Sequence, residues 1–224
     1  MIDLLLNRLL SEERSTKAYL SDTGFDRMMI QEIPAMAVFR EGRGITAGRL
    51  GRDLHGTADY LELVSGPNSR IDRKTPFLTV DVRGIIDGEF KADVIKNIRV
   101  KKYKVWLMTC VRDANDLFDV FNSEADTVLV PYHLTSDDDL EDMLSVSENI
   151  IPAIVNSKLM VPVQRSPEDI LTRLVSMGFD SAAVIDIDGN ISAREWANLS
   201  GITEVLPYSE NVPVIAGRRF ISAL

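Results

Sequence analysis

The hydrophobic residues between Phe77 and the C-terminus fall in short continuous runs, and most runs are followed by a stretch with helical spacing. The runs lack the polar alternation of a half-exposed strand, which indicates strands that are buried on both faces. They are PFLTVDV, KVWLMTCV, DTVLVPYHL, IIPAIVNSKLMV, SAAVIDID and VPVIAG. The stretches between them include KADVIKNIRVKK, RDANDLFDVF, SDDDLEDMLSVS, SPEDILTRLVSMG and SAREWANLSG. Such repeated strand–helix units predict parallel strands joined by right-handed crossovers.

Capping chemistry supports two of the expected helices. Ser166 precedes Pro167, Glu168 and Asp169, which places a capping oxygen, a first-turn proline and acidic residues at a helix start. Ser192 and Glu195 have the spacing of a capping box.

The order of these blocks favours an α/β protein of the (β/α)8 or TIM-barrel type over an open doubly wound sheet, as one domain over 1–224 with 1–30 as a helical N-terminal extension. In the N-terminal third, Ile33 to Phe39 indicates a strand, and GITAG is expected to return as a hairpin arm. Asp59 to Val64 is either a strand or a helical turn. The eighth strand comes from this segment, from EVLPY or from the N-terminus. A regular barrel and an irregular or incomplete one therefore both remain open.

Composition narrows the function classes. The net charge of −9 over 224 residues argues against a general nucleic-acid binder, which normally carries a basic surplus. The apolar N-terminus is interrupted by Arg8 and is too short for a membrane span, so no membrane association is expected. Cys110 is the single cysteine, which excludes an intramolecular disulfide and favours a reducing, cytoplasmic location. We interpret Cys110 as a small core residue.

Charged residues interrupt the apolar run FLTVDVRGIIDG. Side chains two apart on a strand point the same way, so Thr79, Asp81 and Arg83 would share one face, with Val80 and Val82 on the other. We expect the valines to face the surrounding helices. The charged residues would then point into the barrel mouth, where solvent or a ligand satisfies them.

The segment AAVIDIDGN repeats this pattern with Asp186 and Asp188 opposite Ile185 and Ile187. In a barrel the carboxyl ends of the strands open on the catalytic face. Asp81, Asp186 and Asp188 are therefore candidate acid/base groups. His133 is a candidate general acid or hydrogen-bonding group, with a plain rim histidine as the alternative. The alternative is that the charged residues form structural ion pairs at the rim.

Arginines and glycines gather in FREGRGITAGRLGRD, in an otherwise acidic chain. Guanidinium groups and exposed backbone N–H groups suit a phosphate or carboxylate, which makes Arg40 and Arg43 candidate anion ligands. Further candidates at strand ends are Arg83, Arg112, Asn156, Arg218 and Arg219. The alternative is a surface loop whose arginines pair with the surplus acids. No converging set of ligands predicts a metal, and no glycine-rich fingerprint predicts a dinucleotide cofactor.

From Phe77 to Phe220 the blocks TVDVRGI, DVIKNIR, KVWLMTCVRDANDLFDVF, ADTVLVPYHLTSDDDLEDM and IIPAIVNSKLMV resemble successive strand–helix units of one family. IPAMAVFREGRGITAG resembles the first strand and glycine hairpin of the same family. The family is the phosphate-binding barrels of histidine biosynthesis, in particular archaeal proteins related to proFAR isomerase. The resemblance covers about three quarters of the chain, as a pattern of blocks, and implies the barrel fold and binding of a small phosphorylated metabolite.

The resemblance also implies an aspartate on the first strand and another on the fifth as acid and base. The corresponding positions here are Ala37 and either Ile154 or Val155, none of which can transfer a proton. Two functions therefore stay open: isomerase- or lyase-type chemistry on a small anionic metabolite, or a non-catalytic binding or assembly protein. A homodimer is the expected assembly on base rates.

Overall fold

The computed structural model describes residues 31–41, 44–52, 54–67, 69–95, 102–157, 165–209 and 219–224. The expected N-terminal helix at 1–30, Arg43, Arg218 and the expected strand VPVIAG lie outside the described residues. Within the described part, no helix combines the length and apolarity needed to cross a membrane.

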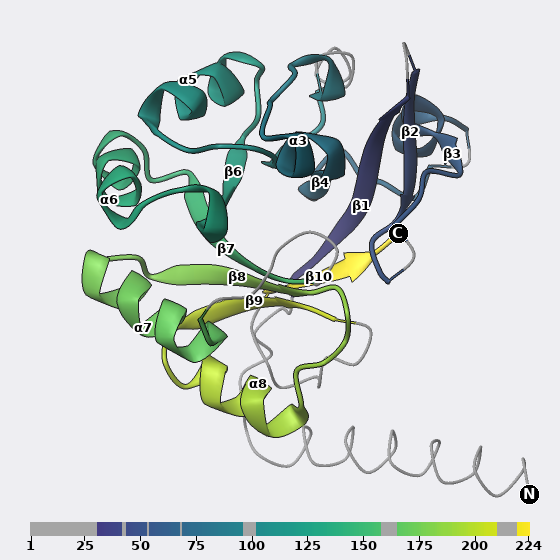
Figure 1. Cartoon of the computed structure of the whole chain (residues 1–224). Helices are drawn as coiled ribbons and strands as arrows, with labels where there is room; N and C mark the ends of the chain where they lie inside the picture. Colours follow the sequence, from purple (N-terminus) through teal and green to yellow (C-terminus); the bar gives the residue numbers. More distant parts are fainter. Residues whose placement is uncertain are drawn as a thin grey trace, which may run out of the picture. The chain divides into compact units, whose positions relative to one another are not determined.

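The main element of the fold is a curled mixed sheet (Figure 1). Its strands are β1 (Gln31–Glu41), β2 (Gly44–Arg49), β3 (Ala58–Asp59), β4 (Phe77–Asp81), β5 (Val105–Met108), β6 (Thr127–Pro131), β7 (Ile150–Asn156), β8 (Ser181–Asp186), β9 (Glu204–Tyr208) and β10 (Arg219–Ala223). From β4 to β9 the strands pair in chain order and in parallel, as the repeated strand–helix pattern predicts.

Strand β1 lies next to β4, the first strand of this parallel series, and pairs with three strands in all. It pairs in parallel with β4 on one side and with β10 on the other. It also continues into an antiparallel hairpin with β2, whose other neighbour is β3. Strand β10 lies beside β9 as well, although no ladder joins these two strands within the described residues.

Helices connect the parallel strands. They are α2 (Tyr60–Ser65), α3 (Val82–Asp87), α5 (Ala114–Asn122), the short 3-10 helix η1 (Tyr132–Leu134), α6 (Asp137–Val146), α7 (Pro167–Met177) and α8 (Ala193–Ser200). The capping residues predicted for α7 and α8 are confirmed: Ser166 caps α7, and Ser192 with Glu195 forms a capping box on α8.

The core has two layers, one on each face of the sheet. The outer cluster joins alternate strand residues to the buried faces of α5, α6, α7 and α8, and it includes Leu107, Val130, Val184, Leu117, Leu140, Leu174 and Trp196. The inner cluster collects the other strand residues, from β1 and from β4 through to β10, and includes Ala37, Val80, Met108, Leu129, Val155, Ile185, Leu206 and Ile221. A single cluster with members from β1 through to β10 is what the curl of the sheet produces.

Two open points of the sequence analysis are resolved. The segment from Tyr60 to Val64 is helical and forms most of α2; Asp59, the last residue of β3, caps this helix by accepting a hydrogen bond from the backbone N–H of Glu62. EVLPY forms β9, and a further parallel strand comes from Arg219–Ala223, which the hydrophobic pattern did not single out because Arg219 and Ser222 leave it no continuous apolar run.

Candidate functional site

The carboxylate of Asp81 joins the ends of three neighbouring strands. Its Oδ2 accepts hydrogen bonds from Arg40 Nη2 of β1 at 2.7 Å and from Thr109 Oγ1, just beyond β5, at 2.8 Å. Its Oδ1 accepts from the backbone N–H of Gly84 at 3.0 Å and so caps α3. The side chain is fully buried. One carboxylate therefore fixes β1, β5 and α3 to the end of β4.

Burial raises the pKa of Asp81 above its usual range, while Arg40, the Gly84 N–H and the Thr109 hydroxyl oppose this shift. A buried carboxyl without these partners would be driven to its neutral form. Their arrangement supplies a hydrogen-bond donor to each oxygen, which is how a buried charged group is normally accommodated.

Arg40 is held on both sides by acids. Besides the Asp81 bond, its Nε lies 3.6 Å from Asp93 Oδ1, and its Nη2 donates to the carbonyl of Lys91 at 3.1 Å. Only 14% of its side chain is exposed. The Arg40 guanidinium, which was predicted to bind an external anion, thus pairs with two carboxylates of its own chain. This corresponds to the alternative in which the arginines pair with the protein's own acids.

A second buried pair lies on the same face of β4. Tyr60 Oη and Thr79 Oγ1 are 2.7 Å apart, between α2 and the strand. Burial raises the pKa of the Tyr60 phenol, and the nearby Asp81 carboxylate adds to that increase. The phenol therefore stays protonated at neutral pH and acts as a fixed hydrogen-bonding group.

Asp186 organises the loop after β8. Its Oδ1 accepts from Asn156 Nδ2 of β7 at 2.8 Å and from the backbone N–H of Asn190 at 3.1 Å. Its Oδ2 accepts from the backbone N–H of Ile191 at 2.9 Å and from Ser209 Oγ, just beyond β9, at 3.3 Å. This carboxylate is also buried, so Asp186 ties three strand ends together in the same manner as Asp81.

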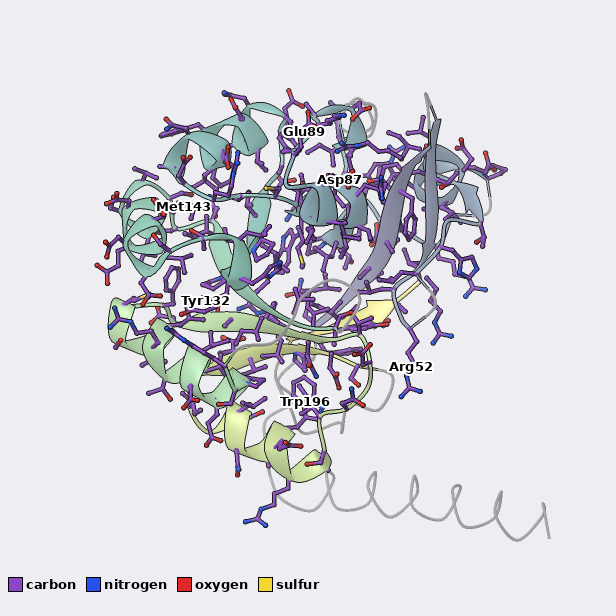
Figure 2. The ribbon with its side chains drawn as sticks, viewed as in Figure 1. Arg52, Asp87, Glu89, Tyr132, Met143 and Trp196 are labelled. Atoms are coloured by element: carbon purple, nitrogen blue, oxygen red, sulfur yellow. The ribbon has the colours of Figure 1, made fainter. Side chains whose placement is uncertain are left out.

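The loop after β8 also accepts a hydrogen bond from an arginine that follows β2. Arg52 Nε donates to the backbone carbonyl of Asp188 at 2.9 Å, and Figure 2 shows Arg52 extending from the segment after β2. Asp188 lies in the turn that follows β8 and is partly buried. Gly189 takes a left-handed conformation there, with φ of 65°, which favours glycine at the turn.

The predicted orientation of the strand ends is wrong. Val80 and Ile185 belong to the inner cluster, whereas Val184 belongs to the outer one. By alternation, Asp186 continues the face of Val184, and Asp81 continues the face of Thr79. These acids therefore lie on the helix-facing side of the sheet and do not point into a barrel mouth.

The reason for this error is where the strands end. β4 stops at Asp81 and β8 stops at Asp186, so Arg83 is on a helix and Asp188 is in a turn. Two-residue alternation does not apply beyond those ends. Because both faces of each strand are apolar, the sequence offers no polar side to orient it.

The remaining predicted residues are dispersed. Arg83 pairs with Asp87 on α3 at 3.3 Å, and Arg112 pairs with Asp116 at 2.9 Å, both on exposed surface. Arg219 begins β10 opposite Gln31, at the amino end of the parallel strands, and pairs with Glu204 at 3.0 Å. It therefore does not share the rim with Asp81 and Asp186.

His133 lies in η1, directly after β6, and is exposed overall. Partial burial nevertheless lowers its pKa to about 4, so the imidazole is neutral at pH 7. Its neighbour Tyr132 donates to Asp137 Oδ1 at 3.0 Å and accepts from Arg165 Nη1 at 3.3 Å. Within the described part of the chain, the structure does not bring His133 into either aspartate network.

Sequence reasoning missed the side chains that do face inwards near the carboxyl ends. Phe39, Leu50, Val82, Ile85 and Ile187 are buried in the inner cluster, and Leu54 and Leu134 pack against it. A signal was present for α3: Asp81 stands three residues before Gly84, and Gly88 follows the short apolar spacing as a helix stop. The inner side of the curled sheet is thus apolar where a polar pocket was predicted.

Among the described residues, no group of three or more histidine, cysteine, aspartate or glutamate side chains could hold a metal ion. No family model matches the chain, and no curated protein matches it.

Proposed function

We propose that the chain is a closed (β/α)8 barrel of the phosphate-binding type that binds a small anionic metabolite without performing proton transfer. Strand β10, which pairs with β1 and lies beside β9, would complete the closure. Its acids at the carboxyl ends of the strands would be structural, and its ligand would be held by charge alone.

One observation carries the non-catalytic part of this proposal. The inward-facing positions of the first and fifth parallel strands, where the resembling family implies its acid and base, hold Ala37 and Val155. Both side chains are buried in the inner cluster, and neither contains an ionisable group. Acid–base catalysis requires a titratable group within reach of the transferred proton.

The hydrogen bonds of the two buried carboxylates support the same conclusion. Asp81 accepts three hydrogen bonds and Asp186 accepts four, all from strand ends and the helix or loops that follow them. A group that must exchange a proton with a ligand needs an oxygen directed at that ligand, whereas these oxygens are directed at the protein's own backbone and side chains.

Arg52 is a described cation suited to an external anion. Arg40, Arg83 and Arg112 each bind a carboxylate, but the bond from Arg52 goes to a neutral carbonyl at the rim beside the β8 turn. Its side chain is exposed. A guanidinium in this position keeps its charge available for a phosphate or carboxylate.

The test is a thermal-shift titration with inorganic phosphate and a panel of sugar phosphates, followed by a search for products by NMR. We expect a rise in Tm for at least one anion, loss of that rise in Arg52→Ala, and no product. Arg112→Ala is the matched control, because it removes an exposed arginine that is already paired, and it should retain the shift. Failure of every anion to raise Tm would overturn the binding proposal.

A second candidate is an enzyme with isomerase- or lyase-type chemistry on a small phosphorylated metabolite. The buried position of Asp81 and its raised pKa favour it, since such perturbed groups occur often at active sites. The same NMR search decides between the two. Turnover by the wild type that disappears in Asp81→Asn, with the fold intact, would establish the enzyme and contradict the non-catalytic proposal.

A further inference from the structure

Helix α3 packs differently from the other crossover helices. The buried residues of α5, α6, α7 and α8 belong to the outer cluster, whereas Val82 and Ile85 of α3 belong to the inner cluster. Figure 1 shows α3 toward the middle of the curl, with the other four helices along its outside. A helix that follows β4 directly and contacts the inward-facing residues lies over the carboxyl-end opening of the sheet.

The opposite face of α3 is in solvent. Arg83, Ile86 and Asp87 are exposed, and the Arg83–Asp87 pair spans one turn of that face. Helix α3 is therefore a single layer between the inner cluster and water. It has six residues, fewer than an isolated helix needs for stability, so its order depends on its attachments.

The attachment at its start is Asp81. The carboxylate holds the Gly84 N–H with one oxygen, and Arg40 and Thr109 with the other. Gly84 fits closely against this network: a Cβ added there would lie 2.2 Å from Asp81 Oδ2 and 2.7 Å from Thr109 Oγ1. The far end of α3 finishes at Gly88 in the left-handed conformation, with open space around it.

We propose that α3 is a latched cover over the inner face of the curled sheet, that Asp81 is its latch, and that α3 opens as a local unit. The carboxylate bonds keep Ile85 inserted in the inner cluster. Release of the Gly84 N–H and of Arg40 frees the helix to move about Gly88 while the strands stay paired. The proposal concerns access to the inner face and stands whether or not the proposed anion is bound.

The single cysteine provides a probe of that opening. Cys110 directly follows Thr109, the latch partner, just beyond the end of β5. Its thiol is buried, with 1% of the residue exposed. Labelling of Cys110 in the native protein by an aromatic disulfide reagent therefore requires local opening of the structure next to Thr109.

The experiment compares Cys110 labelling rates, at fixed pH and without denaturant, in the wild type, Asp81→Ala and Ser192→Ala. Ser192 caps α8 on the outer side of the sheet, so its variant removes a cap without touching the latch. We expect Asp81→Ala to speed labelling at least tenfold more than its loss of global stability accounts for. In Ser192→Ala the labelling rate should rise by no more than the loss of global stability accounts for. Equal behaviour of the two variants would overturn the proposal.

Native-state hydrogen exchange of the wild type keeps the test independent of whether Asp81→Ala folds. The amides of Gly84, Ile85 and Ile86 should exchange at least tenfold faster than those of Leu78 and Val80 in β4, with a weaker dependence on denaturant. Exchange of α3 and β4 together, only through global unfolding, would also overturn the latch.

Discussion

Asp186 Oδ1 accepts a hydrogen bond of 2.8 Å from Asn156 Nδ2, across the parallel pair β7 and β8. The two residues face each other in the strand register, so the bond closes the last rung of that ladder with side chains. The same carboxylate also accepts hydrogen bonds from backbone N–H groups of the next loop. The Asp81 carboxylate links β1, β4, β5 and α3 in the same way. The charged strand ends of this chain are therefore joints between secondary-structure elements.

Replacing Asp81 by asparagine should destabilise the fold. The new side-chain amide would present an N–H₂ group toward donors and leave the partly buried Arg40 guanidinium without one of its carboxylates. Breaking a buried pair from one side costs about 3–5 kcal/mol of unfolding free energy. Denaturant unfolding of Asp81→Asn measures this. The matched control is Asp87→Asn, which removes an exposed i,i+4 pair and should change stability by at most about 0.5 kcal/mol. Equal losses in the two variants would contradict the role given to Asp81.

Gly84→Ala should destabilise the protein although alanine is the better helix former. In an exposed helix interior the exchange gains about 1 kcal/mol. Here the new Cβ meets Asp81 Oδ2 and Thr109 Oγ1 at distances that real Cβ atoms essentially never show. Overpacking of this kind costs about 1–3 kcal/mol, so the unfolding free energy should fall. A stabilised Gly84→Ala variant would show that α3 does not sit against the latch as described.

Sequence reasoning recovered much of the fold because the apolar runs are long enough to fix the strands and their order. It recovered the caps of α7 and α8 because Ser, Pro and Glu stand at fixed offsets there. It could not orient Asp81 and Asp186, because strands that are apolar on both faces carry no mark of which face is inside. The inward apolar residues of the rim, such as Phe39, looked like ordinary strand residues for the same reason.

The pH behaviour of His133 is a further prediction. Its folded pKa of about 4 lies below the ordinary value of 6.5, so the unfolded chain binds the proton first as the pH falls. The neutral imidazole therefore supports folding above pH 6.5, and this contribution is lost as the pH falls towards 4. Its partial exposure keeps the effect small. An NMR titration should show a histidine resonance with a pKa well below 6.5 that disappears in His133→Gln. Titration of His133 near its ordinary value would contradict its partial burial.

Tyr60→Phe tests the buried pair beneath Asp81. Removal of the phenol oxygen leaves Thr79 without its 2.7 Å partner on the α2 side. Leaving one buried hydroxyl unsatisfied costs about 1–3 kcal/mol, and the unfolding free energy from denaturant titration should fall by that amount. An unchanged value would show that the Tyr60–Thr79 contact does not contribute to stability.

The central claim is that the carboxylates at the strand ends hold the fold together and do not carry out chemistry. The most direct measurement is the unfolding free energy of Asp186→Asn relative to the wild type. Two of the four donors around Asp186 would then face an amide N–H₂, and we predict a loss of about 2–4 kcal/mol, since hydrogen bonds to charged groups are worth about 1.5–3 kcal/mol each. Strained catalytic groups are often replaced at no cost to stability or with a gain. An Asp186→Asn variant as stable as the wild type, or more stable, would contradict the account.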